Sequence, residues 1–128
     1  MKNVERKLPS GEMETLKSMT LKMENTLGQV EEIEVLVRPM ANRWQFQKKL
    51  SKAKANAFKI DQHDEFVLGI EIAKEFFEDC LVYPTFTRQN GNGWTLEQQI
   101  EEYFVNSPET FTEIISFLLM AHSKKEKN

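Results

Sequence analysis

The sequence contains few of the residues that build reactive or metal-binding sites. Its 128 residues include one cysteine, Cys80, and two histidines, His63 and His122. A single cysteine cannot form a disulfide within the chain, and the histidines lack the spacing of zinc ligands. Cys80 follows Glu78 and Asp79 on the apolar face of an expected helix, which favours a buried structural thiol over a nucleophile. We therefore predict a protein that is not an enzyme, with no catalytic residue, no metal and no cofactor.

Long apolar runs are also missing. The longest, Phe117–Ala121, is far shorter than the roughly 20 residues that span a bilayer. The first ten residues are polar and lack the apolar core of a signal peptide. The formal net charge of −3 gives no general attraction to nucleic acid or anionic lipid. We expect a cytoplasmic protein without membrane contact, for which nucleic acid is an unlikely partner.

Composition and periodicity predict one domain over residues 1–128, with a flexible terminus at 1–10 and a frayed tail at 123–128. Ile33, Val35 and Val37 alternate with other residues, which predicts a strand over about 30–38 that Pro39 ends. Residues 11–27 fit both a helix and a strand. If residues 19–25 are extended, they form a hairpin with the strand across Gly28.

Helical patterns fill the rest of the chain. We expect helices over about 43–56, capped by Asn42, and about 64–82, capped by Asp61 or Asp64. Two more start after the Thr95–Gln98 capping box and after Ser107, which precedes Pro108. The predicted fold is mainly α, a small domain of about four helices with a short β-hairpin or strand near the N-terminus (α+β).

Charge is segregated between the first two expected helices. Arg38–Lys59 contains seven basic residues and no acid, whereas Asp61–Asp79 contains seven acids and one base. We favour an antiparallel helix pair with complementary charges. The alternative is a small nucleic-acid-binding regulator that uses the basic helix 43–54.

Aromatic side chains are the best candidates for a binding surface. Tryptophan and tyrosine are enriched at protein interfaces, although the same residues also fill helical cores. We take as partner-binding candidates Trp44, Phe46, Trp94, Tyr103 and Phe104. A β-strand with an exposed edge can pair with its copy in a neighbouring molecule. We therefore consider the strand that carries Ile33, Val35 and Val37 for self-association.

The order of these features resembles that of a known family. An alternating strand ends in a proline motif, Glu32–Met40, and is followed by a helix with Trp44, an acidic helix and two helices separated by a Pro108-containing cap. Over roughly residues 30–122 this layout resembles the tail assembly chaperones of long-tailed bacteriophages and prophages. The resemblance implies a non-enzymatic, self-associating protein in the host bacterial cytoplasm. It also implies binding to the helical tape measure protein during tail morphogenesis.

Overall fold

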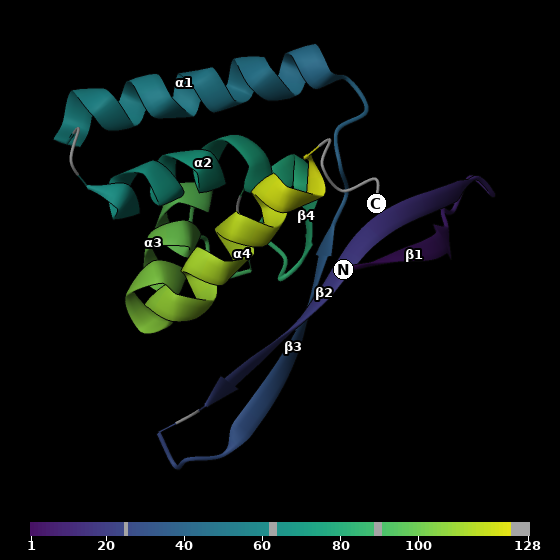
Figure 1. The fold of residues 1–128 in the computed structure, drawn as a ribbon, viewed down its shortest axis with the longest axis horizontal. Helices are drawn as coiled ribbons and strands as arrows, with labels where there is room; N and C mark the ends of the chain where they lie inside the picture. The colour runs from purple at the N-terminus through teal and green to yellow at the C-terminus, as the bar shows by residue number, and fades with distance from the viewer. Residues whose placement is uncertain (25, 62–63, 89–90, 124–128) are drawn as a thin grey trace.

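The computed structural model describes residues 1–24, 26–61, 64–88 and 91–123, which form an antiparallel sheet and four helices (Figure 1). The strands lie in the order β1-β2-β3-β4, which is also their order along the chain. Their bounds are β1 Lys2–Lys7, β2 Met13–Glu24, β3 Val30–Val37 and β4 Leu81–Tyr83. The helices are α1 Arg43–Asp61, α2 Glu65–Cys80, α3 Leu96–Asn106 and α4 Pro108–Ala121. In this part of the chain, every helix is too short or too polar to span a bilayer.

The predicted mainly helical fold is wrong, because the sheet has four strands and makes the protein α+β. The terminus that we expected to be flexible forms β1, in which Lys2 is paired with Ser18 and Lys7 with Met13. Within β1 only Val4 is apolar, so the strand gave no alternating signal. An ion pair between Arg6 and Glu14 joins it to β2 at 2.8 Å.

The ambiguous segment 11–27 contains strand β2. Met19 and Met23 fit a helical spacing with Met13, Leu16 and Leu27 and also alternate with Leu21 as in a strand, and the structure has the strand. The helix expected to reach residue 82 ends at Cys80. Strand β4 begins at the next residue, Leu81, and pairs with the end of β3. A three-residue strand is below the length at which a sequence pattern is informative.

Several local predictions are confirmed. Strand β3 occupies Val30–Val37, and the Asp64 side chain accepts a hydrogen bond from the Phe66 amide at the start of α2. Thr95 and Gln98 form the reciprocal capping box of α3. Pro108 is the first residue of α4, but the Ser107 side chain forms no cap hydrogen bond.

The core lies between the helices and the sheet, with α2 at its centre. Helix α2 contacts the other three helices, and α4 contacts β2 and β3. Phenylalanines dominate the interior: Phe77 packs on Phe86 and Phe111, and Phe76 and Phe117 are fully buried. Burying each such side chain contributes roughly 1.5–3 kcal/mol to folding. This concentration of aromatic side chains fixes the positions of α2 and α4.

Half of the β2–β3 hairpin extends beyond its neighbouring strands. β1 pairs with β2 only as far as Ser18, and β4 pairs with β3 only at Leu36 and Val37. We call residues 19–24 and 30–35, which pair only with each other in the described chain, the hairpin arm. In Figure 1 the arm runs past the helices and away from them. Residues 20–24 of the arm line one side of the cleft described next.

Candidate protein-binding cleft

An open cleft of about 940 Å³ separates the hairpin arm from the first turns of α2 and α4. Its apolar surface comes from Leu21 and Met23 on the arm and from Phe66 on α2. Phe66 is 54% exposed, although it belongs to a helix whose centre is buried. The other lining residues are Thr20, Lys22, Glu24, Glu65, Pro108, Glu109, Thr112 and Glu113.

A narrower groove of about 160 Å³ continues the cleft between α2 and α4. The two hollows share Glu65, Phe66 and Thr112, and the groove ends near Leu119. Gly69 lies on its floor, where an added Cβ would come within 3.5 Å of the Phe111 ring. The missing side chain therefore leaves room between the helices.

The mouth of the cleft is acidic. Glu24, Glu65, Glu109 and Glu113 line it together with one base, Lys22. All four carboxylates are exposed, and none forms an ion pair within the described part of the chain. Lys22 Nζ lies 3.9 Å from the Oε1 atom of Glu32 on the neighbouring strand β3. The cleft thus combines an apolar interior with a negatively charged rim.

The aromatic candidates do not line this cleft. Trp44 is 74% exposed on α1, and Trp94 is 39% exposed just before α3. These helices lie on opposite sides of α2 (Figure 1), so the two tryptophans belong to separate surfaces. Phe46 is buried and stacks on the His122 ring at a centroid distance of 4.3 Å, so it belongs to the core.

Tyr103 and Phe104 are half-buried on α3. Tyr103 packs against Phe86, whereas Phe104 packs against Phe66 with ring centroids 5.3 Å apart. Of the five aromatic candidates, Phe104 therefore contacts the cleft, by supporting the Phe66 ring from behind.

The three residues considered for self-association are buried or half-buried, although most of the other residues of β3 are exposed. Val35 and Val37 are fully buried, and Ile33 is half-buried opposite Leu21. Their side chains are therefore core residues. What β3 leaves accessible is the backbone edge of residues 30–35, which no other described strand covers.

Sequence reasoning missed the residues that line the cleft. Leu21 and Met23 lie in the segment 11–27, which fitted both a helix and a strand, and Phe66 falls on the apolar stripe of the helix predicted over about 64–82. The periodicity places Phe66 on the inner face, where its ring packs on Phe104 of α3, but the residue stays 54% exposed where it borders the cleft. The usable signal was the alternation of Met19, Leu21 and Met23, which implies an apolar strand face.

No protein-family model, curated protein or solved structure matches this chain.

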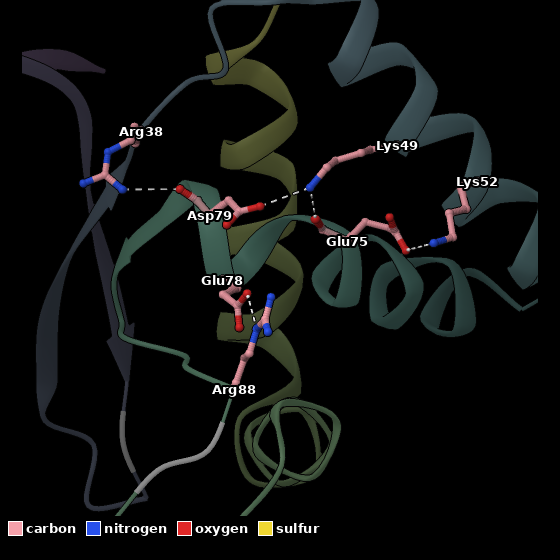
Figure 2. Close-up of polar contacts among 7 residues, drawn as sticks. All are labelled: Arg38, Lys49, Lys52, Glu75, Glu78, Asp79 and Arg88. Atoms are coloured by element: carbon pink, nitrogen blue, oxygen red, sulfur yellow. Dashed lines mark hydrogen bonds and ion pairs between the residues drawn. The ribbon is translucent and has the colours of Figure 1, made fainter.

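The segregated charges pair across two antiparallel helices, as predicted (Figure 2). Lys49 Nζ lies 3.1 Å from an Asp79 carboxylate oxygen, and Lys52 Nζ lies 3.5 Å from one of Glu75. Lys49 also donates to the backbone carbonyl of Glu75. Figure 2 also shows a third ion pair nearby, in which Arg88 Nε lies 3.2 Å from a carboxylate oxygen of Glu78. Two of the lysines of the basic helix α1 therefore form ion pairs with acids of α2.

Cys80 and His122 are structural residues. Burial raises the pKa of the Cys80 thiol to about 11, so it is protonated and unreactive near neutral pH. His122 Nε2 accepts a hydrogen bond from the Met40 amide at 2.9 Å, and its Nδ1 lies 2.9 Å from the Leu118 carbonyl oxygen. His63 lies outside the described residues. Among those described, no group of three or more His, Cys, Asp or Glu side chains could hold a metal ion.

Proposed function

We propose that this protein binds an apolar helical segment of another protein in the cleft between its hairpin arm and helices α2 and α4. The observation that carries the proposal is the cleft itself: apolar side chains from two separate elements face an open hollow of about 940 Å³. An amphipathic helix laid into an apolar groove is a common mode of peptide recognition.

The hairpin arm supports this function physically. A two-stranded hairpin is at best marginally stable in water unless another element covers its apolar face. Near its end, the arm presents the half-buried Met23 to the cleft, beside Leu21, which is buried in the core. A bound segment would cover this face and bury the exposed Phe66 ring, which links ligand binding to the ordering of the arm.

The specific role that we propose is non-enzymatic assembly, as in the tail assembly chaperones that the sequence resembles. The partner would be the long helical tape measure protein, which these chaperones bind in the bacterial cytoplasm during tail morphogenesis. Several copies along one partner would gain affinity from multivalency. The uncovered edge of β3 supports self-association through backbone pairing, which does not require Val35 or Val37 to leave the core.

The test is co-purification of this protein with a phage tape measure protein. The double variant Met23→Gln/Phe66→Gln removes the apolar surface without changing charge. Each substitution should weaken binding by about tenfold, since a partly buried apolar side chain contributes about 1.4 kcal/mol. Val105→Gln is the matched control, because Val105 is 72% exposed on α3 outside the cleft.

Unchanged binding by the double variant, with an unchanged circular dichroism spectrum, would exclude the cleft as the binding site. Loss of binding by Val105→Gln instead would move the interface to α3.

The second candidate function is nucleic-acid binding by α1. Lys48, Lys54 and Lys59 are exposed on this helix. Against this, Lys49 and Lys52 already pair with acids of α2, and these acids would repel a phosphate backbone. A gel shift at low salt that shows no complex would eliminate the candidate. A complex weakened by Lys48→Gln/Lys54→Gln would establish it.

A further inference from the structure

The chemistry of the cleft defines its partner more closely than the proposed function does, and the inference that follows depends on that function. The interior of the cleft is apolar, whereas its mouth carries four carboxylates and one ammonium group. A segment that enters the cleft must satisfy both features, because a like charge placed against the rim would be repelled and an uncharged flank would leave the rim uncompensated.

Two of the four carboxylates have a structural explanation. Glu65 and Glu109 lie in the first turns of α2 and α4, where an acid interacts favourably with the helix dipole. Glu24 and Glu113 have no such role, because Glu24 ends a strand and Glu113 lies beyond the first turn of α4. The negative rim therefore includes two carboxylates that do not lie in the first turn of a helix.

The length of the site bounds the length of the partner. The continuous hollow follows α4 from Pro108 to Leu119. At 1.5 Å per residue this distance is about 16 Å, which corresponds to about three turns of a bound helix. A helix of this length presents an apolar stripe of three or four side chains at i, i+3, i+4 and i+7.

We propose that the partner segment is a cationic amphipathic helix of about three turns, with an apolar stripe flanked by lysine or arginine. The stripe covers Met23 and Phe66, beside the buried Leu21, and the basic flanks lie over the four carboxylates of the rim. The charges give selectivity and faster association, while the apolar contacts provide most of the affinity.

The experiment uses three synthetic helical peptides with one apolar stripe and flanks of lysine and arginine, glutamine, or glutamate. Fluorescence anisotropy with the full chain measures each Kd at low and high salt. The cationic peptide should bind at least tenfold more tightly than the neutral one at low salt. This advantage should shrink in 1 M salt, where the Debye length is about 3 Å.

The double variant Glu24→Gln/Glu113→Gln isolates the rim without touching either helix cap. It should weaken binding of the cationic peptide severalfold and leave the neutral peptide unchanged. The matched control is Glu5→Gln/Glu12→Gln, which makes the same change in net charge at exposed positions outside the cleft. This control should retain the affinity of the unaltered protein for the cationic peptide.

The two proposals can fail separately. Equal binding of all three peptides, or a preference for the glutamate peptide, would overturn the charge selection while the protein-binding function stands. Binding by none of the peptides would overturn the function and the inference together. An equal loss of affinity in the rim variant and in its control would show that only net charge matters, and would also overturn the inference.

Discussion

His122 ties the C-terminal end of α4 to the segment before α1, and its removal should have a measurable cost. The ring is buried and stacks on Phe46 with the ring centroids 4.3 Å apart. Its Nε2 accepts a hydrogen bond from the Met40 amide at 2.9 Å. Its own backbone carbonyl accepts a hydrogen bond from Arg43 at 3.0 Å. In His122→Phe the aromatic stacking persists, but the part-buried Met40 amide loses its acceptor. Leaving such a donor unsatisfied costs about 2 kcal/mol.

This cost should appear in thermal unfolding as a decrease in Tm of roughly 6–10 °C. The dependence of stability on pH gives a second readout. Burial lowers the pKa of His122 below its ordinary value, 6.5, because the neutral ring is favoured in the folded chain. The unfolded chain therefore binds more protons as the pH falls below 6.5, and stability decreases as the pH passes down through the folded pKa.

Unfolding in urea from about pH 7.5 to pH 5.5 tests this reasoning. The difference in unfolding free energy between the unaltered protein and His122→Phe isolates His122 from every other titrating group. We expect this difference to be largest above pH 6.5 and to shrink as the pH falls. A difference that is constant with pH, or below about 0.5 kcal/mol at pH 7.5, would refute the role of the Met40 hydrogen bond.

Three further predictions concern the fold. Hydrogen bonds from Arg38 and Arg6 lower the pKa of Glu14 from 4.5 to about 2. The contribution of Glu14 to the free energy of unfolding should therefore be fully present above pH 4.5 and disappear as the pH falls toward 2. Glu14→Gln should remove this acid dependence in urea titrations. Gly69→Ala should raise the unfolding free energy by about 0.5–1 kcal/mol, because alanine favours the helix and its Cβ meets Phe111 at an ordinary contact distance; a lower Tm would contradict this. Phe46→Ala should lower the unfolding free energy by about 3–5 kcal/mol in urea, and a loss below 1 kcal/mol would mean that the ring is not in the core.

Local signals in the sequence predicted local structure well. Thr95 and Gln98 specify a helix start through their own hydrogen bonds, as does Asp64, and neither depends on distant residues. The helix pair was predictable because its charges repeat along both helices and meet at Lys49–Asp79 and Lys52–Glu75. The caps are encoded within a few residues of where they act, and the helix pair is encoded by charge patterns that each lie within one helix.

The sheet was harder to predict because its outer strands carry little pattern. β1 has a single apolar residue, Val4, and its position depends on pairing with β2. β4 has three residues and pairs only with the end of β3. Neither strand satisfies a periodicity test by itself, so the sequence predicted β3 and left β2 open between helix and strand.

The candidate site was missed for a related reason. A cleft arises from the relative placement of elements that are distant in sequence, here residues 20–24, 65–66 and 108–113. Residue type alone favoured the aromatics, but Phe46 is core and Trp44 lies on another surface. Phe66 was visible in the sequence, yet its exposure depends on where α2 begins relative to the hairpin arm.

Hydrogen exchange of the full chain, with and without the cationic amphipathic peptide, tests the cleft most directly. Binding should slow exchange in the hairpin arm, at Met19–Glu24 and Val30–Val35, and in the first turns of α4 at Pro108–Glu113. Exchange in the middle of α1 and at the start of α3 should not change. Protection confined to α1 or α3, or no protection at a saturating peptide concentration, would contradict the proposal that this cleft binds another protein.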